Sequence, residues 1–237
     1  MTVFSKTIRC LVILLSVITL PACQIMSKLN PDDSANEIKY GNQRASEVLA
    51  VTPLVQNESL QKYINHVGQW VAQQSSRPNL PWRFGLIQTD SIVSFSLPGG
   101  TVLISTGYFS LMENEAQLAA VLAHDIAHID SRHYFKALRN RDWENLIRHG
   151  LDPSRDLDAD RDAAVFIARA GYDPYAMLDL LTTLSAIDSE ATEVDYLNAT
   201  HPSAEGRLSV LAAEMDGRLD SFSDGKLNSE RFLSFVQ

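Results

Sequence analysis

Two histidines four residues apart have the spacing of a metal-binding pair. His124 and His128 stand in the segment VLAHDIAHIDSRH, where apolar residues recur every three to four positions and predict a helix. Four residues advance a helix by about 6 Å and turn it roughly 40° past one full turn, so both imidazoles leave the same face. Such a pair can bind one Zn²⁺ at little conformational cost. The alternative is two partly buried helical histidines that bond to water or to the backbone.

A third ligand should come from another element, and the segment RDLDADRDAA supplies three aspartates near a predicted helix start: Asp156, Asp158 and Asp160. Asp156 and Asp160 share one helical face. One of them could bind a metal while the other orients a ligand histidine through its second ring nitrogen. The alternative is a set of acids that favour a helix N-terminus through the macrodipole. The residues alone leave this choice open.

The elements that would position these residues indicate an α+β chain. A helix is predicted from about Asn57, which can cap it, because apolar residues follow at helical spacing. Three short β-like runs come next, WRFGLIQT, VSFSL and TVLIST, with a turn at Pro98, Gly99 and Gly100. Further helices are predicted over residues 113–138, from a cap at Ser154 to Gly171, from Asp173-Pro174 to about Ile187, and from Pro202 to about Met215. This order of helix, small sheet and helices is typical of the α+β class.

The first residues of the chain predict a secretion signal. Lys6 and Arg9 precede an apolar run over residues 11–20, which is too short to span a bilayer as a helix. Ala22 followed by Cys23 resembles the lipobox of bacterial lipoproteins, in which Cys23 becomes the lipidated first residue; Gln24 after it resembles the signal for outer-membrane sorting. The alternatives are an ordinary cleaved signal, or a short helix followed by a chance cysteine. We therefore expect a lipoprotein signal peptide over residues 1–22, a lipid-anchored tether over residues 23–40 and the folded domain over residues 41–237.

Composition excludes several classes of protein. The chain of 237 residues is 45% hydrophobic and 21% charged, which is ordinary for a globular domain. Its net charge of −9, without a basic block, disfavours nucleic acid as a partner. Cys10 and Cys23 are the only cysteines, so a disulfide scaffold is excluded.

Three segments, taken in order, resemble the HtpX-like zinc peptidases, which form family forty-eight of the metallopeptidases. They are LPGGTVLISTGYFSLMENEAQLAAVLAHDIAHIDSRH, DLDADRDAAVFIARAGYDP and THPSAEGRL. The resemblance runs from about Glu37 to about Leu211. It implies a zincin-like metallopeptidase domain with a small sheet packed on the active-site helix, further C-terminal helices, and one Zn²⁺ per chain.

The resemblance also assigns roles to residues. Matched to the family's HExxH and ExEAD motifs, His124, His128 and Asp156 are the metal ligands, and Asp125 stands at the position of the general base. Asp160 matches the aspartate that supports a ligand histidine. His201 and Arg207 match the HPxxxxR segment, which lies near the cleft and could contact substrate, the oxyanion or the metal; the alternatives are a helix-start residue for His201 and a surface cation for Arg207. The segment VSFSLPGG matches an edge strand that would pair with an extended peptide through Ser94, Phe95, Ser96 and Leu97.

Departures from the family pattern bear on activity. Both motif glutamates are aspartates here, HDIAH for HExxH and DLDAD for ExEAD, and each shorter side chain withdraws its carboxylate by about 1.5 Å, one C–C bond. Asp is a good zinc ligand, so the change at Asp156 is tolerable if the second helix shifts inward. The base is more demanding, because a misplacement of about 1 Å can cost on the order of 10²-fold in rate. The shorter side chain of Asp125 at the position of the base thus predicts either a slow peptidase or an inactive one.

The family resemblance implies a zinc-dependent endopeptidase of the bacterial envelope that cleaves misfolded or misassembled polypeptides. Its location would be the periplasmic side of the outer membrane, which it would reach through an N-terminal lipid anchor. Two alternatives stay open. One is a catalytically weakened or inactive homologue that binds peptides as a chaperone or adaptor. The other is a structural lipoprotein in which the histidine pair and the acids are only solvated or buried polar groups.

Overall fold

The computed structural model describes residues 33–187 and 191–236. The predicted signal peptide and the lipidation site Cys23 lie outside the described residues. The helix α2 (Ser34–Val51) begins inside the segment expected as a tether over residues 23–40. Residues 34–40 form the first turns of this helix instead, with Asp33 as the N-cap.

A three-stranded sheet lies at the centre of the fold. Its strands β1 (Arg83–Ile87), β2 (Ser94–Leu97) and β3 (Thr101–Ser105) are the three β-like runs of the sequence. The strand order is β1-β3-β2; β3 is parallel to β1 and antiparallel to β2. Gly99 and Gly100 both have positive φ in the tight turn before β3, a conformation that glycine adopts without steric cost. In the order β1-β3-β2, the strand β2 lies at one edge of the sheet.

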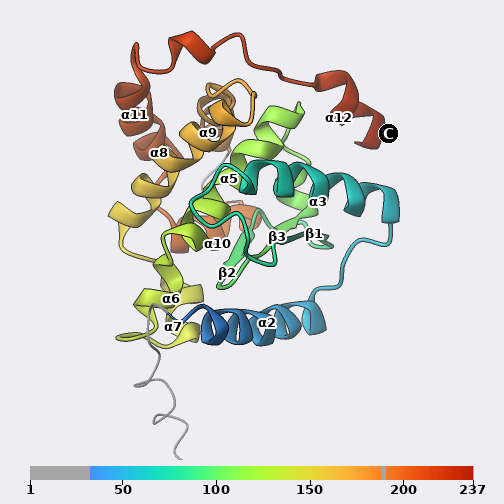
Figure 1. The fold of residues 1–237 in the computed structure, drawn as a ribbon, viewed down its shortest axis with the longest axis vertical. Coiled ribbons are helices and arrows are strands. Elements are labelled where there is room, and N and C mark those ends of the chain that lie inside the picture. Colours follow the sequence, from blue (N-terminus) through green and yellow to red (C-terminus); the bar gives the residue numbers. More distant parts are fainter. Residues whose placement is uncertain (1–32, 188–190, 237) are drawn as a thin grey trace, which may run out of the picture.

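The long helix α5 (Glu115–Asp130) packs on one face of this sheet. Every one of its residues through Ile129 is buried, because α3 (Glu58–Ala72), α8 (Pro153–Arg169) and α9 (Ala176–Ser185) pack around it. The predicted cap of α3 at Asn57 is confirmed: its side chain accepts the Leu60 N–H. Figure 1 shows α3 and α5 on one side of the sheet and α2 on the other.

Shorter helices complete the fold. They are α4 (Thr106–Phe109), α6 (His133–Ala137), α7 (Trp143–His149), α10 (Asp195–Thr200), α11 (Ala204–Met215) and α12 (Ser229–Val236), with short 3₁₀ turns at Thr192–Val194 and Asp220–Phe222. Sequence patterning predicted α11 but not α7, α10 or α12, which are too short to show a clear period. The predicted α+β class is confirmed.

The helix predicted over residues 113–138 is interrupted. α5 ends at Asp130, and α6 starts in a new direction at His133. Between them Arg132 has φ 57°, in the left-handed region that commonly terminates helices. Its guanidinium Nε lies 3.1 Å from Glu37 Oε2, and this ion pair with α2 offsets the backbone cost.

The start of α8 also differs from the prediction. The N-cap is Asp152, whose carboxylate accepts both the N–H and the hydroxyl of Ser154. Pro153 occupies the first helical turn, where its missing N–H costs nothing. Ser154 therefore lies inside the helix, and Asp156 follows it in the first turn.

Glu37 explains why the polar segment at the start of α2 folds against the domain. This carboxylate is fully buried and pairs with Arg77 at 2.6 Å as well as with Arg132. One turn later, Gly41 allows close contact with the strand turn, because a Cβ there would lie 1.6 Å from the Pro98 carbonyl oxygen. α2 thus fixes the turn that follows β2, which in turn fixes the edge strand.

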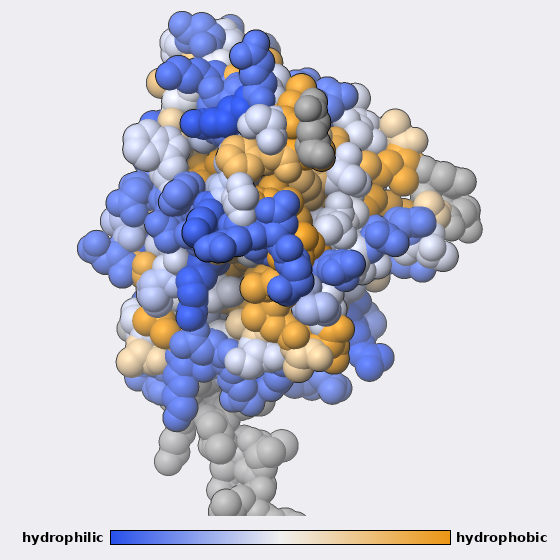
Figure 2. Space-filling model, turned by 90° about the vertical axis from the view of Figure 1, so that its right-hand side faces the viewer, coloured by the Kyte–Doolittle hydropathy of each residue, from blue (hydrophilic) through white to orange (hydrophobic). Residues whose placement is uncertain are grey.

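The surface of the domain carries apolar patches among hydrophilic ones. Figure 2 shows such patches on the side where α12 and the facing ends of α2 and α3 lie. Exposed apolar side chains include Val51 at the end of α2 and Leu233 and Val236 on α12. None of the helices in the described ranges is long and apolar enough to cross a bilayer.

A buried carboxylate at the start of α5 ties the C-terminal helix to the core. Glu115 is fully buried; it accepts hydrogen bonds from Tyr63 at 2.9 Å, Tyr172 at 2.7 Å and Asn228 at 3.0 Å, and it pairs with Arg231 of α12. Burial alone would raise the pKa of this carboxyl, but the hydrogen bonds from Arg231 and the two tyrosines outweigh it and lower the pKa.

We predict that Glu115→Gln destabilises the protein near neutral pH by about 1–3 kcal/mol, because charge-assisted hydrogen bonds become neutral ones. A carboxyl with a lowered pKa stabilises the fold above its unfolded-state pKa of about 4.3 and loses this effect as the pH falls. The difference between wild type and Glu115→Gln should therefore shrink below about pH 4. Urea unfolding at pH 7 and at pH 3.5 measures it; an equal difference at both pH values would contradict the assignment.

Candidate metal centre

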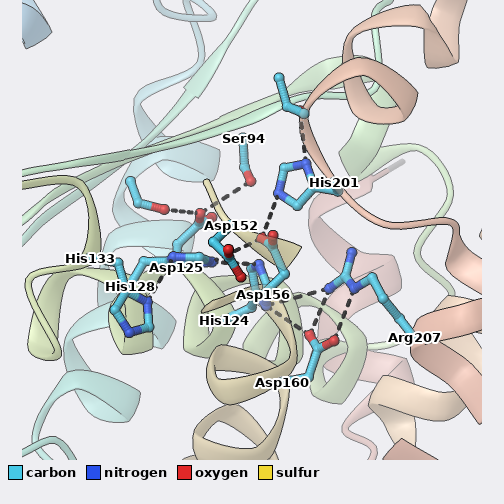
Figure 3. Close-up of polar contacts among 12 residues, drawn as sticks. Ser94, His124, Asp125, His128, His133, Asp152, Asp156, Asp160, His201 and Arg207 are labelled. Atoms are coloured by element: carbon cyan, nitrogen blue, oxygen red, sulfur yellow. Dashed lines mark hydrogen bonds and ion pairs between the residues drawn. The ribbon is translucent and has the colours of Figure 1, made fainter. Parts of the chain in front are cut away.

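The two histidines of α5 face one another as their spacing predicted. His124 and His128 are 6% and 1% exposed, and their Nε2 atoms lie 3.1 Å apart. Figure 3 shows them beneath β2, opposite the start of α8 and the end of α10. Both rings thus point into one buried site between three elements.

A buried ion pair orients His124. Its Nδ1 lies 2.8 Å from Asp160 Oδ1, and Arg207 donates to both oxygens of Asp160, at 2.7 and 2.9 Å. Burial raises the pKa of Asp160, but the Arg207 guanidinium outweighs it and holds this pKa well below its usual range. The ionised carboxylate assigns the ring proton of His124 to Nδ1. The Nε2 lone pair of His124 is therefore free to bind a cation, and Asp160 takes the supporting position that the resemblance implied.

His201 joins the site from the end of α10. Thr200 Oγ1 donates to the Tyr196 carbonyl and lies 2.8 Å from His201 Nδ1, so Nδ1 is assigned as the donor to this oxygen. Burial lowers the pKa of His201 to about 3 and keeps the ring neutral. Its free Nε2 lies 3.7 Å from Asp156 Oδ1. A bare nitrogen lone pair thus faces a carboxylate.

Asp156 supplies the negative charge of the site. It is 1% exposed, its Oδ2 has no hydrogen-bond partner, and its Oδ1 lies 3.5 Å from His128 Nε2. Burial lowers the pKa of His128 as it does that of His201, so a buried carboxylate beside these two neutral rings is costly unless a cation neutralises it. Each of His124, Asp156 and His201 offers one ligand atom within 4.8 Å of the other two.

These donors fit a divalent metal ion. Tetrahedral Zn²⁺ with ligands at about 2.0–2.1 Å places neighbouring ligand atoms roughly 3.3 Å apart. Three separations lie close to that value: 3.1 Å between His124 and His128, 3.5 Å between His128 and Asp156, and 3.7 Å between Asp156 and His201. Nitrogen and carboxylate donors of this kind suit zinc and related transition metals. His201 therefore lies in one group of donors with His124 and Asp156, and His128 adjoins this group through its contacts with His124 and Asp156.

His133 is a member of the site that sequence patterning missed. Its Nδ1 lies 3.2 Å from His128 Nδ1, on the side of the ring away from the other donors. Burial, with Arg155 nearby, lowers the pKa of His133 to about 4, so the ring is neutral and can accept a hydrogen bond. Five residues separate it from His128, across the break after α5, and no helical period links them.

We expect His133→Ala to weaken metal binding by about 10- to 100-fold, the usual loss when the partner of a ligand histidine is removed. Competition with a fluorescent chelator measures the affinity. His149→Ala, which removes an exposed histidine at the end of α7, is the matched control. Unchanged affinity in His133→Ala would show that His133 does not orient His128.

Asp125 lies beside the donor group, under the edge strand. It is 2% exposed, and its Oδ1 accepts hydrogen bonds from Ser96 at 2.5 Å and Ser94 at 3.2 Å. Burial raises the pKa of Asp125, while the neighbouring His124 and the serine hydroxyls oppose that rise. Its Oδ2 is buried and without a hydrogen-bond partner. The carboxylate is thus available for acid–base chemistry on that oxygen.

Arg207, expected near substrate, the oxyanion or the metal, is buried against Asp160. It is 3% exposed; its Nε and Nη2 donate to Asp160, and Nη2 also lies 3.4 Å from His124 Nδ1. It is not a surface cation. Because Arg207 bonds Asp160, and Asp160 bonds His124, Arg207 helps to orient His124.

The expected substrate strand coincides with β2, from Ser94 to Leu97. Because the Ser105 N–H donates to the Val93 carbonyl, the alternating ladder directs the peptide groups of Ser94 and Ser96 away from β3. These groups can pair with an added strand.

At the other edge of the sheet, side chains bond the outward peptide groups of β1. Gln61 bonds both the N–H and the carbonyl of Leu86, and Asn65 accepts the Phe84 N–H. β2 is therefore the edge better suited to an extended peptide.

Comparison with known proteins agrees with this site. Residues 58–150 match Peptidase family M48, a range that contains His124, Asp125 and His128 and ends before Asp156. The family resemblance predicted from the three sequence segments is confirmed, and with it the zincin-like α+β class.

Similar proteins include beta-barrel assembly-enhancing proteases. The one from Escherichia coli (strain K12) is 26% identical over 205 residues, which cover 73% of this chain and 42% of that protein. The one from Yersinia pestis is 25% identical with the same coverage. The mitochondrial metalloendopeptidase OMA1 from Schizosaccharomyces pombe is 25% identical over 62% of this chain and 50% of that protein. The chain thus spans about two fifths of the length of the beta-barrel assembly-enhancing proteases.

Proposed function

We propose, from the match to Peptidase family M48 and the geometry of the buried donors, that this chain is a zinc-dependent endopeptidase. The observation that carries the proposal is the convergence of His124, His128, Asp156 and His201 beside the unpartnered oxygen of Asp125. Zinc bound there would polarise the scissile carbonyl and lower the pKa of water. Side chains and backbone groups of this chain would align the substrate, transfer the proton and orient the metal ligands.

The proposed roles follow from position. The outward peptide groups of Ser94 and Ser96 would align an extended substrate along β2. Asp125 would take a proton from the attacking water through Oδ2 and deliver it to the leaving amine. Asp160 and Arg207 would keep His124 in its metal-binding tautomer.

His201 would have to leave the metal during catalysis. A catalytic zinc site keeps one position open for water or substrate, and four protein donors leave none. Of the four, His201 alone lies outside the helices α5 and α8, at the junction between α10 and α11. We propose that it is the donor that substrate displaces.

The proposed substrates are misfolded or misassembled polypeptides of the bacterial envelope. Support comes from the relatives named beta-barrel assembly-enhancing proteases and from the open edge of β2. This edge would pair with a substrate through backbone groups and so requires little of the substrate's sequence.

We further propose that Cys23 is lipidated and that the protein lies at the periplasmic side of the outer membrane, because lipobox-like residues precede Cys23. The peptidase domain would then be tethered close to its substrates.

Casein cleavage by the purified, zinc-loaded protein tests the proposed function. We expect cleavage that stops with a chelator, returns with zinc and is absent from His124→Ala. A folded, zinc-loaded wild type that cuts no peptide bond would overturn the enzyme proposal and favour a peptide-binding homologue. Binding of reduced, unfolded casein without cleavage would identify that alternative.

A further inference from the structure

The edge strand holds the carboxylate of Asp125. Ser96 Oγ and Ser94 Oγ both donate to the same oxygen, Oδ1, at 2.5 and 3.2 Å. Asp125 and Ser96 are 2% and 7% exposed, so the shorter of these bonds is shielded from water. Figure 3 shows Ser94 above Asp125, with a dashed line between the two side chains.

The strand geometry makes this arrangement specific. Residues two apart in a strand place their side chains on one face, and Ser94 and Ser96 both face α5. Phe95 between them points to the other face and lies edge-on against Tyr196, with ring centroids 5.8 Å apart. The peptide groups of the two serines meanwhile point to the open edge. The strand that would bind substrate therefore also contacts the acid beside the metal ligands.

We infer that Ser94 and Ser96 are positioning residues for Asp125. Two donors on Oδ1 restrain rotation of the carboxylate and leave Oδ2 as the oxygen turned toward the reacting groups. This inference rests on the proposed function, in which Oδ2 accepts a proton. Without the hydroxyls, Oδ1 would be a second buried oxygen without a partner, and the carboxylate could turn away from its productive orientation.

The double variant Ser94→Ala/Ser96→Ala tests the catalytic consequence. We expect kcat for casein cleavage to fall about 10- to 100-fold, because a misdirected base slows the chemical step. KM should stay within about twofold, since the peptide groups that would bind substrate are unchanged. Ser94→Thr keeps a hydroxyl and should retain near wild-type kcat. Ser91→Ala, a partly buried serine of the same segment, is the matched control.

Unfolding measurements test the contact without reference to activity. We expect Ser94→Ala/Ser96→Ala to lower the urea midpoint of the protein as purified. In an Asp125→Ala background the same pair of changes should shift the midpoint by less than half as much, because the partner is already missing. Ser94→Ala alone, at the longer bond, provides the cycle if the double variant does not fold.

Three results would overturn the inference. They are equal midpoint shifts in both backgrounds, a change in KM with kcat unchanged, and a higher kcat in Ser94→Ala/Ser96→Ala. Failure of the proposed function looks different, because the folded, zinc-loaded wild type would then cut no casein. In that case the unfolding cycle still decides whether the two serines hold Asp125.

Discussion

Asp125→Asn should reduce casein cleavage by about 10²- to 10⁴-fold, the range that general-base assistance contributes. Asn has nearly the same shape as Asp, and its carbonyl oxygen can still accept the hydrogen bonds from Ser94 and Ser96. It cannot take a proton from water at neutral pH. Metal binding should be unchanged, since Asp125 has a proposed role in proton transfer and its Oδ1 is already engaged by Ser94 and Ser96. Cleavage rates and bound metal, measured on the same preparation, separate these effects.

Asp125→Glu sharpens this result by adding one methylene, which moves the carboxylate by about 1.5 Å. The structure has Asp125 already held by β2, so a longer side chain must displace the serines or bend away from them. We expect less activity than in wild type. Wild-type rates in Asp125→Asn would contradict the role of Asp125 as base.

Arg207→Met should destabilise the protein by about 3–5 kcal/mol, because it leaves Asp160 as a buried charge without its partner. Asp160 is 1% exposed and Arg207 3% exposed, so water cannot replace the lost contact. For a chain of this size, such a loss lowers the midpoint of thermal unfolding by roughly 10 °C. Asp160, which accepts the hydrogen bond from His124 Nδ1, is then no longer held by Arg207, so metal affinity should fall. Thermal unfolding and chelator competition measure the two effects.

Arg161→Met is the matched control for Arg207→Met. Arg161 also lies in an acidic environment, paired with Asp158 at 2.6 Å and with Glu214, but its side chain is 45% exposed. A surface ion pair of this kind contributes about 0–1 kcal/mol. Equal destabilisation by the two variants would show that burial of the Arg207–Asp160 pair does not increase its contribution to the stability of the fold.

Local patterns predicted the parts of the site that lie within single elements. Helical spacing was enough to place His124 and His128 on one face, and the same rule related Asp156 to Asp160. The strand runs and the Pro-Gly-Gly turn gave the sheet, because turn chemistry and β-like composition are local properties. Asn57 was identified as a cap for the same reason.

Contacts between distant segments could not be predicted in the same way. The bonds from Ser94 and Ser96 to Asp125 span about 30 residues, and no period relates a strand to a helix. His133 was missed because α5 breaks at Arg132, where a pair with Glu37 stabilises a left-handed residue. Serines at alternate positions of an edge strand, opposite an acid on a helix, are a signal that could direct such a search.

The content of bound zinc tests the central claim most directly. Purified wild type, equilibrated with zinc and freed of excess metal, should carry one zinc ion per chain by elemental analysis. Asp156→Asn and His124→Ala should carry close to none, while Asp125→Asn should keep one. Wild type without bound zinc, or equal zinc in wild type, Asp156→Asn and His124→Ala, would contradict a metal centre built from these residues.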